Sequence, residues 1–231
     1  MVDLSRFIQV FIGEGIVLAF CIFFSYKILR KDRTRMKIAF SEFYIFISIG
    51  LILNVIYIAL SDQFIVKILN FLTNFCIFLA AIFLVNFCLL FYYTEEKFNL
   101  KKQVILIVIY SIVLFCMVFI PDGVTIDCSS GECTPPLWSI PFFLYIFIVL
   151  TIFTFIPISY YSIKILDKFD DEQLKKKWKY FIFGIMFLYA FLYGSLFSNT
   201  PAFADVLWAP IGLVFAIIGI YLVYYGIAKS F

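Results

Sequence analysis

Long apolar runs separated by short charged stretches make up almost all of this sequence. A transmembrane helix needs about 20 mostly apolar residues to cross roughly 30 Å of hydrocarbon, and the runs are close to that length. The pattern therefore predicts an all-α integral membrane protein, with a single domain built as a bundle of seven transmembrane helices. The expected spans cover approximately residues 7–28, 38–60, 64–93, 104–120, 139–163, 180–197 and 206–227.

The basic residues are distributed unevenly between the two ends of these spans. With seven spans, all of the 18 lysines and arginines except Arg6 and Lys67 fall on one side, most densely between Lys164 and Tyr180. Basic residues near span ends stay on the cytoplasmic side of a membrane. The N-terminus is therefore expected outside and the C-terminus in the cytoplasm, with the protein in the plasma membrane. The basic residues expected to form a cytoplasmic surface for a signalling protein or for membrane lipids are Arg30, Lys31, Arg33, Arg35, Lys37, Lys175, Lys176, Lys177 and Lys179.

The composition indicates that lipid surrounds most of the chain, and it excludes several kinds of catalytic and metal chemistry. Only 14% of the residues are charged, whereas soluble domains carry about 25%. Seven spans leave no room for a soluble catalytic domain within 231 residues. The absence of histidine excludes His-ligated zinc, bis-His haem and histidine general bases. We therefore expect a protein that is not an enzyme and that uses no metal, no cofactor and no nucleic-acid partner.

Glu14 is the one carboxylate well inside an apolar run, since Glu42 lies near the end of its span. An ionisable residue within a membrane is costly and by default indicates a functional site. Gly13 and Gly15 flank Glu14 and would let another helix approach closely. Lys67, at the outer start of the third span and at comparable depth, is the expected cationic partner. The alternative is that Glu14 lies close enough to the outer surface to be simply hydrated.

A second set of polar and small residues lies on one face of the third span. Asn70, Asn74, Ala81 and Cys88 share this face of the helix. Buried amides in membranes often serve only to join neighbouring helices. The alternative is a polar pocket open to the outside, because binding pockets are typically apolar with a few converging polar groups. The residues proposed to line such a pocket are Glu14, Asn54, Lys67, Asn70 and Asn74.

The longest outer loop carries two cysteines, Cys128 and Cys133. Both face the oxidising side of the membrane, where disulfides form and persist. Gly131 between them would let the chain fold back far enough to bring the two Cα atoms within disulfide range. We expect a disulfide that closes this loop, and the alternative is two free thiols.

Two features of the spans predict details of helix packing. Gly212, Gly219 and Gly226 recur at sevenfold spacing in the last span, with Ala216 on the same face. Small residues let helices pack at close range, so this face is expected to be a packing seam. Pro157 is expected to kink the fifth span, because proline removes a backbone donor from the helix.

The last third of the chain resembles the seven-helix membrane domain found at the N-terminus of many bacterial and archaeal histidine kinases. The resemblance rests on the basic run DEQLKKKWKYFIFGIMF with Gly184, on Pro210 to Gly212 at the opening of the last span, and on Tyr225 to Ile227 at its inner end. It covers residues 171–231 by motif and the whole chain by length and topology. It implies a sensory domain that transmits a signal across the membrane. Members of that family continue into a PAS or kinase module, whereas this sequence ends at Phe231, so the resemblance implies a stand-alone sensor with a separate partner.

Three functions are compatible with these features. The first is a receptor-like protein that binds a small molecule or lipid from the outer side and signals through its cytoplasmic surface. The second is a small transporter or channel, which would need polar residues continuing toward the inner half of the bundle. The third is a structural subunit of a larger membrane complex, for which the basic surface and the glycine seam would contact partners.

Overall fold

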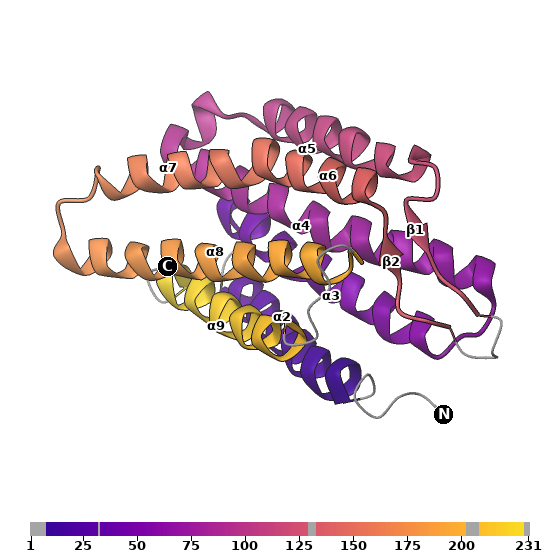
Figure 1. The fold of residues 1–231 in the computed structure, drawn as a ribbon. Coiled ribbons are helices and arrows are strands. Elements are labelled where there is room, and N and C mark those ends of the chain that lie inside the picture. Colours follow the sequence, from indigo (N-terminus) through magenta and orange to yellow (C-terminus); the bar gives the residue numbers. More distant parts are fainter. Residues whose placement is uncertain (1–7, 32, 129–132, 202–207, 229–231) are drawn as a thin grey trace.

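The computed structural model describes residues 8–31, 33–128, 133–201 and 208–228, which form a bundle of helices joined by short connections (Figure 1). Two helical segments are π-helical, η1 and η3, and one is a 3₁₀ turn, η2. The elements in chain order are η1 (Ile8–Glu14), α2 (Gly15–Lys31), α3 (Arg35–Ile58), α4 (Gln63–Lys97), α5 (Leu100–Phe115), η2 (Cys116–Phe119), β1 (Val124–Thr125), β2 (Leu137–Trp138), α6 (Ile140–Leu150), η3 (Thr151–Phe155), α7 (Ile156–Leu166), α8 (Glu172–Ser198) and α9 (Trp208–Ala228).

Six helical segments within the described residues are long and apolar enough to cross a membrane. They are Phe11–Arg30, Arg35–Ile58, Gln63–Tyr93, Leu100–Phe119, Ile140–Leu166 and Glu172–Ser198. Each coincides with one of the first six expected spans. The seventh expected span corresponds to α9, whose apolar part, Ile211–Ile227, is shorter. The expected starts of the first and last spans, at residues 7 and 206, lie outside the described residues. The predicted all-α bundle of membrane-spanning character is therefore confirmed.

Helix α4 lies at the centre of this bundle. Every residue from Phe78 to Leu84 is buried, so the helix is covered on all sides rather than on one face. It packs mainly against α3, and it also contacts α5, α7 and η3. A Cβ built on Gly50 of α3 would lie 2.6 Å from the Ile77 side chain of α4, which shows how closely the two helices approach.

The glycine seam predicted for the last span joins α9 to α8. A Cβ built on Gly219 would lie 3.0 Å from the carbonyl oxygen of Gly184, and one on Gly226 would lie 2.7 Å from the backbone nitrogen of Phe181. Ala216 is also buried. Only residues without a Cβ allow the two backbones to approach this closely. The predicted seam is confirmed at Gly219 and Gly226, with Gly184 as its counterpart on α8.

Helix α8 begins at Glu172 rather than near residue 180. Its N-cap is Asp171, whose carboxylate accepts a hydrogen bond from the backbone nitrogen of Gln173 at 2.7 Å. The lysines from Lys175 to Lys179 therefore lie on the first turns of a helix and not in a loop. The expected span at 180–197 therefore covers only part of α8, because an apolar run marks the segment suited to lipid, whereas the helix itself begins before that run.

The fifth expected span is interrupted just before Pro157. The segment Thr151–Phe155 is π-helical, and the backbone nitrogen of Ile156 donates to the carbonyl oxygen of Thr151, five residues earlier. Proline cannot donate a hydrogen bond, and π turns commonly accommodate such breaks in the α-helical pattern. The irregularity expected from Pro157 therefore takes the form of a π turn that separates α6 from α7.

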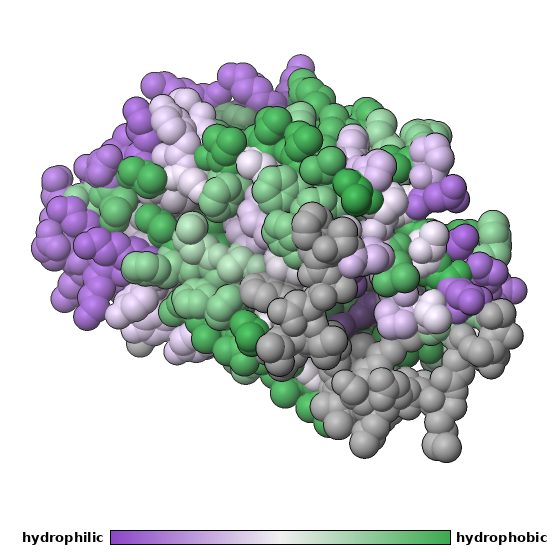
Figure 2. Space-filling view, viewed as in Figure 1, coloured by the Kyte–Doolittle hydropathy of each residue, from purple (hydrophilic) through white to green (hydrophobic). Residues whose placement is uncertain are grey.

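The outer surface of the bundle is apolar along its middle. Figure 2 shows hydrophobic residues across the centre and hydrophilic residues concentrated at the end where α7 leads into α8. Helix α5 contributes a continuous apolar face of exposed side chains. These are Val104, Ile105, Val108, Ile109 and Ile112. An exposed apolar face of this size is typical of a surface that contacts lipid.

The loop between α5 and α6 forms a two-residue antiparallel hairpin in which Val124 pairs with Trp138. The predicted disulfide between Cys128 and Cys133 is confirmed, with the two Cα atoms 4.0 Å apart. Residues 129–132, which include Gly131, lie outside the described residues. Gln63 Nε2 donates to the carbonyl oxygen of Ile126 at 2.8 Å, so the hairpin is tied to the start of α4.

Candidate functional site

Glu14 lies where three helical segments meet. It is the last residue of η1, immediately before α2, and its side chain is partly buried. Asn54 of α3 donates from Nδ2 to Glu14 Oε2 at 2.5 Å. The preceding residue, Gly13, is buried against α9, because a Cβ built on it would lie 2.6 Å from the Leu213 side chain. The carboxylate is thus held by a neighbouring helix at a π-helical turn, a feature that is frequent at functional sites.

The partner of Glu14 on the neighbouring helix differs from the expected one. The sequence favoured an ion pair with Lys67, but the side chain of Lys67 is exposed and forms no ion pair with Glu14 among the described residues. Depth along the membrane normal was the only criterion available from the sequence. It does not report which face of each helix points toward the other, and here Asn54 has the favourable orientation.

Asn70 and Asn74 form a local pair on α4. Asn74 Nδ2 donates to the backbone oxygen of Asn70 at 3.0 Å and to its side-chain oxygen at 3.1 Å. Asn70 is only 3% exposed, and the neighbouring Thr73 is also buried with no partner for its Oγ1. The hydrogen bonds of Asn74 are therefore within one helix, which differs from the expected role of joining helices.

The two amide-bearing helices bring Asn54 and Asn70 to a similar level. Gly50 of α3 faces Ile77 and the backbone oxygen of Thr73 on α4. Helices α3 and α4 are joined by a short connection and run in opposite directions (Figure 1). Asn54 lies about one turn after Gly50 on α3, and Asn70 lies about one turn before Thr73 on α4, so the two amides are at a similar level. Four of the five residues proposed from the sequence thus gather at one end of the bundle, and Lys67 lies beyond them, exposed.

A second group of polar contacts, deeper in the bundle, was not predicted. The hydroxyls of Thr151 in η3 and Tyr193 in α8 lie 2.8 Å apart. Cys88 of α4 lies 3.8 Å from the Ser162 hydroxyl of α7, and Trp178 Nε1 of α8 donates to the Ser162 carbonyl at 2.7 Å. These groups come from four different elements, so no single span displays them as a stripe. Their only sequence signal is isolated hydroxyl residues within apolar runs.

The basic residues predicted to form a cytoplasmic surface lie mostly at one end of the bundle, the strongly hydrophilic end in Figure 2. Lys175 pairs with Glu172 at 3.1 Å between Nζ and Oε1. The side chain of Lys31 lies outside what the structure describes. The exposed members of the set are Arg30, Arg33, Arg35, Lys176 and Lys179, and the partly buried ones are Lys37, Lys175 and Lys177.

Within the described ranges, no group of three Cys, Asp or Glu side chains is placed to hold a metal ion. Comparison of the chain with protein family models, with curated proteins and with solved structures finds no match to any of them. The resemblance to the membrane domain of histidine kinases therefore stays a prediction made from the sequence.

Proposed function

We propose that the protein is a receptor-like membrane protein that binds a small molecule or lipid from the outer side. In this proposal the chain crosses the plasma membrane seven times, with α9 as the last span and the N-terminus outside. The observation that carries the proposal is the pairing of Glu14 with Asn54 where η1, α3 and α9 meet.

The chemistry of this pair favours a ligand that carries a positive charge or hydrogen-bond donors. A carboxylate carries a negative charge and is an acceptor with several lone pairs. A ligand with a positive charge or several donors complements such a group, and charge-assisted hydrogen bonds of this kind are among the strongest. A ligand entering between the outer ends of the helices would meet Glu14 and Asn54 first, with Asn70 and Asn74 on the adjacent helix.

The packing supplies a connection from this site to the basic end. Gly13 rests on Leu213 of α9, and α9 is joined along its length to α8 through the glycine seam. Helix α8 starts with the lysines of the proposed cytoplasmic surface. A ligand that binds two arrangements of these helices with different affinity would shift the position of α8, and this differential affinity is what signalling requires.

Native mass spectrometry of the protein, extracted gently from its own membrane, tests this proposal. The wild type should retain a discrete small molecule or lipid, and Glu14→Gln should lose it because the negative charge is gone. Glu42→Gln is a matched control, since Glu42 is also partly buried in an apolar helix but lies near the opposite end. Retention of the same ligand by Glu14→Gln, or its loss from both variants, would contradict the proposal.

A transporter is the second candidate, and the deeper polar contacts favour it. The stripe on α4 ends at Cys88, but Thr151, Ser162 and Tyr193 add hydroxyl groups beyond and beside it from other helices. A transporter requires such groups along its path, whereas a receptor does not. Replacement of Tyr193 by Phe would reduce transport of the ligand into vesicles if this candidate is right, and would leave binding at Glu14 unchanged if the receptor is right.

A further inference from the structure

Four tyrosines form a continuous aromatic surface at the end of the bundle where α4 and α7 finish. Tyr92 and Tyr93 come from α4, and Tyr160 and Tyr161 come from α7. The ring centroids of Tyr92 and Tyr161 are 5.4 Å apart, and those of Tyr160 and Tyr161 are 5.2 Å apart. The hydroxyls of Tyr93 and Tyr161 lie 3.4 Å from each other, so the cluster is joined across the two helices. We call these four residues the tyrosine surface.

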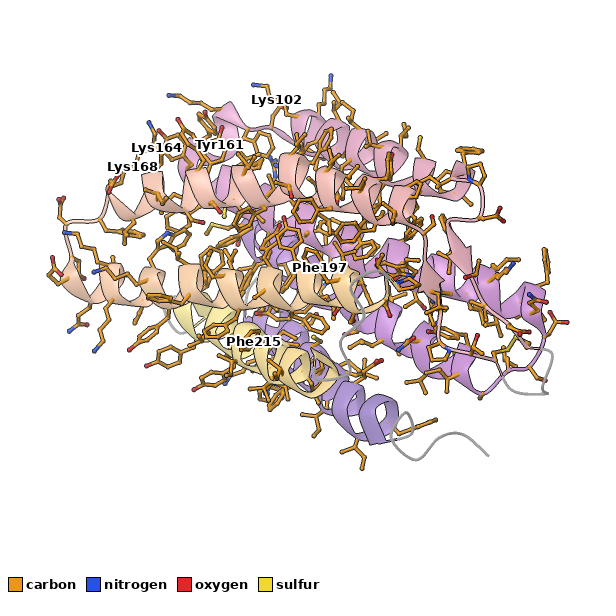
Figure 3. All side chains as sticks on the ribbon, viewed as in Figure 1. Lys102, Tyr161, Lys164, Lys168, Phe197 and Phe215 are labelled. Atoms are coloured by element: carbon orange, nitrogen blue, oxygen red, sulfur yellow. A yellow bond between two sulfur atoms is a disulfide. The ribbon has the colours of Figure 1, made fainter. Side chains whose placement is uncertain are left out.

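Two lysines lie on the tyrosine surface. Lys168 Nζ is 3.6 Å from the centroid of the Tyr92 ring, and Lys164 Nζ is 5.3 Å from that of Tyr160. Figure 3 shows both lysines together at the end of α7, beside Tyr161. Both side chains are exposed, and neither forms an ion pair in the part of the chain that the structure describes. Asp167, between them in sequence, is close enough to Lys164 to attract it weakly.

We propose that Lys164 and Lys168 bind the phosphate of an anionic phospholipid at the tyrosine surface. Each ammonium group lies beside a tyrosine ring, and neither forms an ion pair within the described residues, so both charges remain available to an anion. Contact with the ring faces restricts the flexible ammonium groups and so reduces the entropy lost on binding. A phosphate group has several acceptor oxygens and can accept from both lysines at once.

The surroundings favour a lipid over a free phosphate ion. Tyrosines are enriched at membrane–water interfaces, where the ring is in an apolar region and the hydroxyl is in a polar one. A row of exposed apolar side chains lies on η3 and α7, on the residues that precede the two lysines. They are Ile152, Ile156 and Ile163. An acyl chain lying on these residues would place its headgroup beside Lys164 and Lys168, which gives the site both a polar and an apolar part.

This site differs from the basic surface predicted from the sequence. Lys175 is already paired with Glu172, and Lys176 and Lys179 are exposed on α8 without a cation–π contact among the described residues. They share the general attraction of lysine for an anionic membrane, but not the aromatic surface beneath the charges. Lys176 and Lys179 therefore provide a matched control with the same loss of charge.

The test uses the full chain in nanodiscs that contain equal amounts of phosphatidylglycerol and phosphatidylcholine, followed by native mass spectrometry. The wild type should retain phosphatidylglycerol in preference to phosphatidylcholine. Lys164→Gln with Lys168→Gln should weaken this retention roughly thirtyfold, because two lysine–phosphate contacts of about 1 kcal/mol each are lost. Lys176→Gln with Lys179→Gln should retain it, and circular dichroism should show that both double variants are folded.

Four results would overturn the proposal. Equal losses in the two double variants would mean that only the total charge matters. Equal retention of both lipids by the wild type would mean that the headgroup charge is not recognised. Displacement of the lipid by millimolar inorganic phosphate would point to a site for a free anion instead. Lys164→Arg with Lys168→Arg, which keeps both charges, should preserve phosphatidylglycerol binding, and its complete loss would equally contradict the role given to the two cations.

Discussion

Asn54 determines how the Glu14 carboxylate is accommodated inside an apolar helix. Its amide donates to the carboxylate from a neighbouring helix, so the two residues are coupled and neither can be changed without affecting the other. The sequence identified both residues, because a carboxylate and an amide are unusual within apolar runs. It could not identify their pairing, since rotation of each helix about its axis depends on the packing of the whole bundle.

Replacing Asn54 by Leu should therefore destabilise the protein. The variant removes one donor from the carboxylate, and a hydrogen bond to a charged group contributes about 1.5–3 kcal/mol. The double variant Glu14→Leu with Asn54→Leu should recover part of this loss, because the carboxylate is then absent as well. Thermal unfolding of the wild type, both single variants and the double variant in the same detergent measures the coupling. Additive effects of the two single changes would show that the pair is not coupled.

At the level of helices, the apolar pattern predicted roughly where each of the six long apolar helices lies, whereas the apolar part of the expected seventh span is shorter. It did not predict the irregular turns. The π turn of Thr151–Phe155 depends on how the chain before Pro157 packs against its neighbours, and η1 had no signal that distinguished it from α2. The first turns of α8, which precede its apolar run and are capped by Asp171, were not predicted either.

The contact between α8 and α9 provides a direct test of helix packing. Gly184→Ala should lower the stability of the protein by about 1–3 kcal/mol, as is typical of overpacking. The added Cβ would lie 2.7 Å from the backbone nitrogen of Val223 and 2.9 Å from the carbonyl oxygen of Gly219, and backbone cannot move aside as a side chain can.

Gly15→Ala is the control for this change. A Cβ at Gly15 meets nothing within 4 Å, so this variant should be neutral or more stable, by up to about 1 kcal/mol from helix propensity. Thermal unfolding in one detergent compares the two variants. Equal stability of Gly184→Ala and Gly15→Ala would show that the helices are not in close contact at Gly184.

For the whole molecule, the hydrophobic pattern predicted the helical bundle more completely than the local motifs predicted a site. Every span in lipid must satisfy its own backbone hydrogen bonds, which favours a helix of mostly apolar residues that is visible in the sequence. A binding site needs specific groups from several helices to converge, and the sequence does not show this. Glu14, Asn54 and Asn70 were found as individual polar residues. The tyrosine surface could not be recognised as one site from the sequence, because its rings come from two distant segments and are brought together by the packing of α4 on α7.

Both proposed sites depend on one claim about the whole molecule, which is that the chain crosses the membrane seven times with its basic end inside. The ligand site at Glu14 would then face the outside, and the phospholipid site at Lys164 and Lys168 would face the cytoplasm. An even number of crossings would put both termini on the same side, and the opposite orientation would exchange the two faces.

The most direct test is to label single cysteines in intact cells with a thiol reagent that does not cross membranes. Ser5→Cys and Ser230→Cys are made in a background with Cys76→Ala and Cys116→Ala, because Cys116 is exposed and Cys76 is partly buried, whereas Cys21 and Cys88 are buried. The account predicts that Ser5→Cys is labelled in intact cells and that Ser230→Cys is labelled only after permeabilisation. Labelling of both positions from the same side, or of Ser230→Cys alone in intact cells, would contradict it.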